Sequence, residues 1–328
     1  MASSSKEIQR RIKSIKNTAK ITRAMEMVAA AKMKKEVDRV LSVRSYANLA
    51  WKFLTNLSRA FEKQKHGLLE VRPVKNILVI LITSNRGLCG GYNSQLLKKL
   101  MAHIENPESL KINRVGKKKI LSPVANQDLN FEFIAVGKKG FDYLNRRYKV
   151  VALFDDLNYY VGLEDVRALA KLAIDDYIQE KYDKVVIAYT DYVNPLLQLP
   201  KLRQLLPISK IDLEKHLEEM RQTEAVGEPE KIGEEKEKRE EELIDYKIEP
   251  EPKKIVNEML PRLVEMQLYH SILESNASKE SARMMTMRNA TEAAGEMVAD
   301  LQYTFNQMRQ AGITQEIAEI TSGQVALE

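Results

Sequence analysis

The sequence has few of the residues that build disulfides or metal sites. It has one cysteine, Cys89, and four histidines in 328 residues. A single cysteine excludes a disulfide within the chain and fits a reducing compartment. The histidines are far apart and lack the spacing of metal ligands, so we expect no zinc site and no cofactor. They are His66, His103, His216 and His270.

Long apolar runs are also missing. No run of 18 or more apolar residues occurs, so the sequence predicts no membrane-spanning helix. The N-terminus lacks the apolar core of a secretory signal, and its basic pattern runs on far beyond the length of a transit peptide. The net charge is +6 and unevenly spread, since residues 6–35 alone hold ten Lys/Arg against two Glu. A basic arm fits nucleic acid, an acidic membrane surface or an acidic protein partner.

Prolines are absent from both ends of the chain: none precedes Pro73 and none follows Pro261. The first tract predicts a helix from an N-cap at Ser5 to His66, ending at Gly67. A helix of about sixty residues is ~90 Å long, so it needs a partner helix to cover its apolar stripe. The stripe recurs in steps of four and three, with a break in phase near residue 20: Ile8, Ile12, Ile15, Ala19, then Ile21, Met25, Val28.

The last tract supplies a heptad pattern from Met287 onward, which predicts a coiled coil. We expect this helix to run antiparallel to the first one within the same chain. A homodimeric zipper is the alternative. The two expected seam positions hold Met287, Ala294, Leu301 and Met308, and Ala290, Met297, Thr304 and Ala311.

The middle of the chain alternates apolar strand-like runs with helical segments, which is typical of an α/β domain. The fold class is therefore α/β, with a long antiparallel two-helix coiled coil from the termini and a small domain whose sheet is mostly parallel. Expected strands are 76–82, 131–136, 150–154 and 185–189, and expected helices are 93–104, 138–147 and 163–181.

This pattern divides the chain into four parts. We expect an N-terminal coiled-coil helix (1–67), an α/β domain (68–210), a charged insert or linker (211–245), and a C-terminal foot and coiled-coil helix (246–328). The insert has few apolar residues and many Glu and Lys, so we assign it no core.

A glycine-rich stretch, SNRGLCGGYN (84–93), follows the first strand and precedes a helix, as phosphate-binding loops do. It has neither the Lys-Ser/Thr pair of a P-loop nor the spacing of a dinucleotide fingerprint. We expect a tight turn, with Asn93 or Ser94 capping the helix and Cys89 as a buried thiol. No catalytic constellation emerges elsewhere, so the sequence predicts a chain that is not an enzyme by itself.

Four stretches resemble the γ subunit family of the F-type ATP synthases. They are IKSIKNTAKITRAMEMVAAAKMKK (12–35), TSNRGLCGGYN (83–93), QLPKLRQLLP (198–207) and the C-terminal stretch 280–327, which begins ESARMMTMRNATEAAGEM. They occur in family order along nearly the whole chain, and the two terminal motifs are highly specific.

The resemblance implies a rotor shaft in the central stalk, turned by a proton-driven c ring and acting on a ring of α and β subunits that carries the catalytic sites. It implies that α, β, ε and the c ring are the partners, with no nucleic acid. The complex would place this chain on the cytoplasmic face of a bacterial inner membrane, as a peripheral subunit.

The resemblance also assigns residues. Met25 matches a position near the acidic loop of β, and the basic residues Lys20, Arg23, Lys32, Lys34 and Lys35 surround it. These basic residues form either a solvated face or a surface complementary to the moving acidic loops. Arg309, Gln310 and Thr314 match positions of polar contact with the ring, and Ile317 lies beyond them. Ile313, Ile317 and Ile320 would sit in an apolar bearing or pack on the first helix. In the foot segment, Tyr246 and Glu249 match positions of expected contact with the c ring.

Two other functions remain open on the residues alone. A nucleic-acid-binding coiled coil would explain the basic arm but not the α/β domain or the long C-terminal helix. An α/β enzyme would need a phosphate-binding loop that the glycine spacing does not provide.

Overall fold

The computed structural model describes residues 2–61, 66–115, 118–121, 129–157, 161–208 and 252–325. The chain forms two compact units. Unit 1 consists of Met1–Ala31 and Arg283–Glu328, and unit 2 consists of Lys32–Ala282. The helices α1 (Ala2–Phe61) and α7 (Pro252–Val325) contribute residues to both units.

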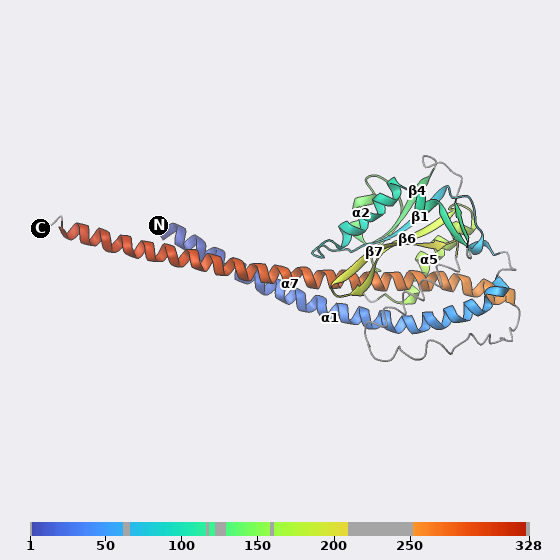
Figure 1. Ribbon diagram of the computed structural model, residues 1–328, viewed down its shortest axis with the longest axis horizontal. Coiled ribbons are helices and arrows are strands. Elements are labelled where there is room, and N and C mark those ends of the chain that lie inside the picture. The colour runs from blue at the N-terminus through green and yellow to red at the C-terminus, as the bar shows by residue number, and fades with distance from the viewer. Residues whose placement is uncertain are drawn as a thin grey trace. The chain divides into compact units, whose positions relative to one another are not determined.

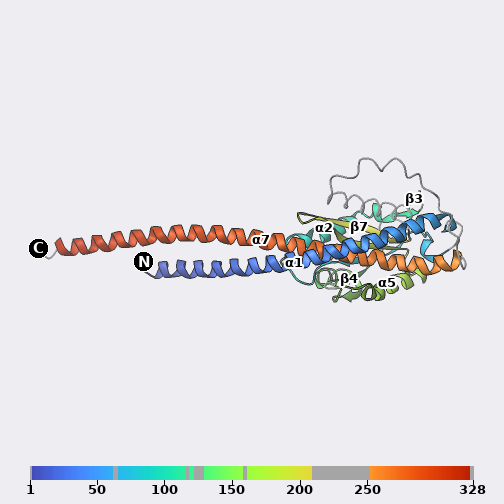
Figure 2. The same ribbon diagram turned by 90° about the horizontal axis from the view of Figure 1, so that it is seen from below.

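In unit 1, α1 and α7 lie side by side and run antiparallel (Figures 1 and 2). The N- and C-termini lie at the same end of this pair, where α7 extends beyond α1. Neither glycine nor proline interrupts α1. The intramolecular antiparallel pairing expected from the two proline-free tracts is therefore confirmed.

The ends of α1 differ from the prediction. The helix starts at Ala2, so Ser5 is inside it and not its N-cap. His66 is in an extended conformation and precedes a short 3₁₀ turn, η1 (Gly67–Leu69), so the helix does not include it. The imidazole Nδ1 of His66 accepts a hydrogen bond from the Leu68 amide. This bond makes His66 the cap of the next turn, a role that a helix period cannot reveal.

Unit 2 contains a five-stranded sheet in the order β5-β4-β1-β6-β7. The strands β1 (Asn76–Ile82), β4 (Asn130–Val136), β5 (Lys149–Phe154) and β6 (Lys184–Asn194) are parallel. All four expected strands and the mostly parallel α/β class are thus confirmed. β7 (Leu197–Leu206) pairs antiparallel with β6 at one edge.

Helices cover both faces of this sheet, because alternate residues of a strand point to opposite faces. Leu78, Ile80 and Ile82 of β1 pack in one core with α5 (Leu163–Ile178) and the α7 stretch around Leu260–Ile272. Ile77, Val79 and Leu81 pack in the other core with α2 (Tyr92–Glu105) and with Leu144 of α4 (Lys138–Leu144). The buried strands read as continuous apolar runs for this reason.

The sequence did not predict three strands and a helix. β7 carries Pro200 and alternates weakly, and a proline is tolerated in an edge strand because it removes only one ladder donor. β2 (Ile112–Val115) and β3 (Lys118–Leu121) form a separate two-stranded ladder after the short α3 (Glu108–Lys111). The four-part division of the chain stays a prediction, and its insert at 211–245 lies outside the described residues.

Gly137 connects β4 to α4 with φ +99°, and a Cβ atom there would lie 2.4 Å from the Thr83 carbonyl oxygen. We predict that Gly137→Ala lowers the free energy of unfolding of the chain by about 2 kcal/mol or more, because both the backbone and Thr83 must shift. Urea denaturation followed by circular dichroism measures this. Gly87→Ala is the control, since nothing lies within 4 Å of its Cβ position. Equal stability of the two variants would contradict the argument.

Candidate functional site

The candidate site is the two-helix seam of unit 1 together with the outward faces of the same helices. On α1, the half-buried and buried positions follow one another in steps of four and three without interruption. They are Ile8, Ile12, Ile15, Ala19, Thr22, Glu26 and Ala29. Seven positions in strict heptad spacing define a coiled-coil seam.

The break in phase expected near residue 20 is wrong. The seam continues through Thr22, whereas Ile21 is 61% exposed and Val28 is 55% exposed. The prediction assigned apolar residues to the seam. In the structure, a hydrogen-bonded threonine occupies the seam, and two β-branched apolar residues point outward. Met25 is half-buried beside the seam.

On α7, only the first of the two expected seam positions is correct, and only in part. Met287 and Ala294 are buried and Leu301 is half-buried, but Met308 is 41% exposed. The second position lies four residues after the first, at Thr291, Val298, Phe305 and Gly312. The expected second row is wrong: Ala290 is half-buried, Met297 is 52% exposed, and Thr304 and Ala311 are exposed. A heptad allows the second seam position to lie three or four residues after the first. Because Thr291 is polar, the sequence did not reveal that the spacing here is four.

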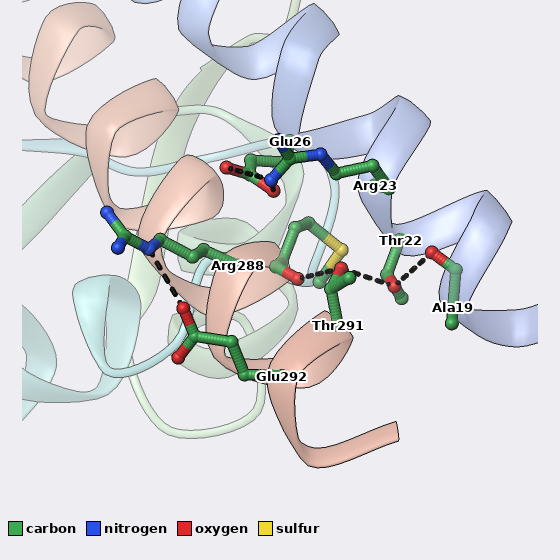
Figure 3. Close-up of polar contacts among 8 residues, drawn as sticks. Ala19, Thr22, Arg23, Glu26, Arg288, Thr291 and Glu292 are labelled. Carbon is green, nitrogen blue, oxygen red and sulfur yellow. Dashed lines mark hydrogen bonds and ion pairs between the residues drawn. The ribbon is translucent and has the colours of Figure 1, made fainter. Parts of the chain in front are cut away.

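Two threonine hydroxyls meet across the seam (Figure 3). Thr22 Oγ1 and Thr291 Oγ1 are 2.7 Å apart. Each hydroxyl also reaches a carbonyl of its own helix, Thr22 that of Ala19 at 3.1 Å and Thr291 that of Met287 at 2.8 Å. Two hydroxyl protons serve three contacts, so one hydroxyl donates across the seam while the other donates to its own helix. A polar pair inside an apolar seam fixes the register of the helices.

Two ion pairs near the threonine pair each join residues of a single helix (Figure 3). Arg23 Nη1 lies 2.9 Å from Glu26 Oε2, and Arg288 Nε lies 3.1 Å from Glu292 Oε1. Both arginine side chains are more than half exposed, at 61% and 58%. Exposed pairs of this spacing add little stability, so the charges are available at the surface.

The outward faces carry large apolar side chains as well as charges. Within unit 1, the exposed large apolar residues of α1 and of the middle of α7 are Ile21, Met27, Val28, Met297, Tyr303 and Met308. Lys20 and Arg23 are exposed next to them. Large exposed apolar side chains beside charged ones are typical of surfaces that bind another macromolecule.

The last turns of α7 expose every residue that the resemblance selected there. Arg309, Gln310, Thr314 and Ile317 are all exposed. The Thr314 hydroxyl donates to the Gln310 carbonyl of the same helix. Ile313, Ile317 and Ile320 are 50%, 59% and 71% exposed, so they do not pack on α1. Their spacing of four and three places them on one face of the helix.

The two foot residues, Tyr246 and Glu249, lie outside the described residues.

A buried acid lies in unit 2, where Glu36 of α1 is 6% exposed and its Oε1 is 3.7 Å from Arg39 Nη1. Burial raises the pKa of Glu36, and the attraction of Arg39 and Lys279 offsets this only in part.

The glycine-rich turn is held by its own side chains. The Ser84 amide donates to Asn93 Oδ1, and Asn93 Nδ2 donates to Ser84 Oγ at 2.8 Å and to Cys89 Sγ at 3.4 Å. Cys89 is 2% exposed, so the buried thiol is confirmed. The predicted cap is wrong: Gly91 is the N-cap of α2, and Asn93 is used to close the turn instead. Among the described residues, no cluster of His, Cys, Asp and Glu could hold a metal ion.

Sequence reasoning missed one residue of this turn, Tyr92. Its hydroxyl lies 2.6 Å from Ser275 Oγ and donates to the Ser275 carbonyl at 3.1 Å. Ser275 belongs to the part of α7 that lies in unit 2. A tyrosine at the start of a helix after a glycine pair gives no sequence signal for such a distant partner.

These features define a class: a protein whose two terminal helices pair in unit 1 and whose unit 2 holds an α/β sheet domain. The family model described as ATP synthase matches residues 4–327. An ATP synthase gamma chain of Roseiflexus castenholzii is 37% identical over 99% of this chain and 98% of its own length. The chain therefore belongs to the ATP synthase family, as a gamma-chain subunit of the central stalk.

Two solved structures support the same fold. A chain of the central stalk and c ring of the Tetrahymena thermophila mitochondrial ATP synthase has a TM-score of 0.52 at 25% identity, covering 82% of this chain and 99% of that one. A chain of the Euglena gracilis mitochondrial ATP synthase has a TM-score of 0.60 at 16% identity, covering 100% and 95%. The central-stalk function is thus favoured over a nucleic-acid-binding coiled coil. No described helix is long and apolar enough to cross a membrane.

We predict that the threonine pair contributes a coupling free energy of about 1 kcal/mol to unit 1. A double-mutant cycle with Thr22→Val, Thr291→Val and the double variant measures it from urea unfolding, because valine keeps the shape and replaces the hydroxyl with a methyl group. Thr18→Val combined with Thr291→Val is the control, since the Thr18 hydroxyl is exposed and bonds only to its own helix. A cycle at Thr22 that is as additive as the control would refute the cross-seam bond.

Proposed function

We propose that this subunit is the rotor shaft that carries torque from a proton-driven c ring to a ring of α and β subunits, where ATP is made or hydrolysed on β. The observation that carries the proposal is the slender two-helix unit 1, whose outward faces differ. One helix exposes lysines and arginines beside Ile21 and Val28, and the other exposes Met297 and Tyr303.

Such a pair cannot present the same surface to three identical neighbours at once. Each neighbour meets a different face, and a face that binds one conformation better shifts that neighbour toward it. Turning the shaft then moves each neighbour through the same series of conformations in sequence. Catalytic groups on this chain are not needed for that mechanism.

On this proposal, Lys20, Arg23 and Met25 contact acidic loops of β, and exposed basic side chains favour such a partner. Arg309, Gln310 and Thr314 form polar contacts with the ring, and Ile317 enters an apolar bearing. Residues Tyr246 and Glu249 of the foot contact the c ring.

The ε subunit docks beside the α/β domain in the same proposal. The chain is then a peripheral subunit on the cytoplasmic face of a bacterial inner membrane, attached through the complex. Nucleic acid is not among the proposed partners.

Coexpression with α and β subunits tests the partner set directly. We expect one copy of this chain to purify with three copies of each of the others, as measured by native mass spectrometry. A basic coiled coil that binds nucleic acid would instead leave the α and β subunits behind and bind DNA with a steep salt dependence.

Met25→Lys tests the contact with β. We predict that ATP hydrolysis continues while ATP-driven proton pumping falls several-fold, because an added cation changes an electrostatic contact that must release at every step. Pumping in membrane vesicles, normalised to hydrolysis, measures this coupling. Met25→Leu is the control, because it keeps an apolar side chain of similar volume and should stay coupled. Full coupling in the lysine variant would remove Met25 from the contact.

A further inference from the structure

Three buried serines of α7 face the α/β domain of unit 2. Ser275, Ser278 and Ser281 are each 0% exposed and follow one another at intervals of three residues. Positions three apart on a helix form an inclined row along its surface. We call these three residues the serine row.

Each member of the serine row contacts a different part of the domain. Ser275 meets the Tyr92 hydroxyl at 2.6 Å, at the end of the glycine-rich turn. Ser278 donates to the Thr190 carbonyl of β6 at 3.1 Å. Ser281 donates to the Pro195 carbonyl, in the β6–β7 hairpin, at 2.7 Å and accepts a hydrogen bond from Gln198.

These partners gather at the carboxyl ends of β1 and β6. In the sheet order β5-β4-β1-β6-β7, the chain goes from β1 to β4 and then β5 on one side of β1. It then crosses from β5 to β6, which lies on the other side of β1. The direction in which strands are added therefore reverses between β1 and β6. Open α/β proteins bind ligands in the crevice at such a point. Here Tyr92 and Thr190 bind the serine row of α7 at that place.

Beyond the serine row, α7 contacts the domain through an ion pair, in which Glu265 Oε2 lies 3.9 Å from Arg167 Nε of α5, and through apolar side chains. Leu260, Leu263, Val264, Leu268 and Ile272 belong to the core that α5 shares with the sheet. Apolar burial is not directional, so it resists separation of the helix from the sheet more than sliding or turning along it. Hydrogen bonds weaken steeply when their angle or length changes. The serine row therefore fixes how far the domain is rotated about α7.

We infer that the serine row and Tyr92 lock the α/β domain to α7, so that the domain and the helix turn as one body when torque passes between them. This inference rests on the proposed function, because a lock of this kind matters only if force crosses it. Tyr92 and the serines are positioning residues and touch no substrate. The glycine-rich turn thereby gains a role, since its tight bend puts Tyr92 at the start of α2 beside α7.

The test uses the whole ATP synthase in membrane vesicles with a combined Ser275→Ala, Ser278→Ala and Ser281→Ala variant. Ser271→Ala is the matched control: Ser271 is 2% exposed on the same helix, but its hydroxyl donates to the Gln267 carbonyl of α7 itself. We expect the triple variant to assemble and hydrolyse ATP while the number of protons pumped per ATP falls at least about twofold. The control should keep the ratio of the unchanged enzyme.

An assembled triple variant with an unchanged ratio would overturn the inference. Should the triple variant not assemble, Tyr92→Phe decides, because it removes one hydroxyl and keeps the ring. The number of protons pumped per ATP must also fall in Tyr92→Phe, and an unchanged number again overturns the lock. Failure of the unchanged chain and of Ser271→Ala to join α and β would instead refute the proposed function, so the two failures are distinguishable.

Amide hydrogen exchange of the purified chain gives a second readout. Loss of one directional bond should speed exchange in the β6–β7 hairpin roughly fivefold in Ser278→Ala, because the Thr190 carbonyl loses its donor. Ser271→Ala should leave that hairpin unchanged. Equal exchange in both variants would be evidence against the lock.

Discussion

The structure depends on the need to cover the apolar stripe of a helix that is much longer than any domain in the chain. α1 has sixty residues without a proline or glycine, and a helix of that length cannot bury its stripe against a single small sheet. Pairing with α7 solves this in unit 1, and both helices must then enter unit 2. The two ends of the chain are therefore brought together by the same interaction that builds the stalk.

The composition of the seam sets the thickness of that stalk. Ala19, Thr22, Ala29 and Ala294 are small, so the helices can approach closely, and their packing contributes less apolar burial than leucines would. The large apolar residues Ile21, Val28 and Met297 are outside the seam, although Ile8, Ile12, Ile15 and Leu301 remain in it. Unit 1 thus places apolar surface where a surrounding partner can use it, at a cost to the pairing of its own helices.

Sequence reasoning predicted most of the fold because its main signals are local. The parallel strands are apolar runs, and the long helices lack prolines, so both could be recognised residue by residue.

The seam was harder to predict. Thr22 and Thr291 occupy it although they are polar, and they do so because their hydroxyls are hydrogen-bonded to each other. β7 was hidden by Pro200, and His66 by a cap that only backbone geometry reveals. The contacts of Tyr92 with Ser275, at a sequence separation of 183, have no local signal at all. The proposed ring and foot contacts could be named only through the family resemblance, since nothing in their spacing specifies a partner.

The crevice between β1 and β6 holds a segment of the protein itself, and this makes α7 an intramolecular ligand. A tethered ligand has no dissociated state in the folded chain and an effective concentration that no free nucleotide can match. A diffusing small molecule therefore finds the usual binding position of this fold class already taken by α7.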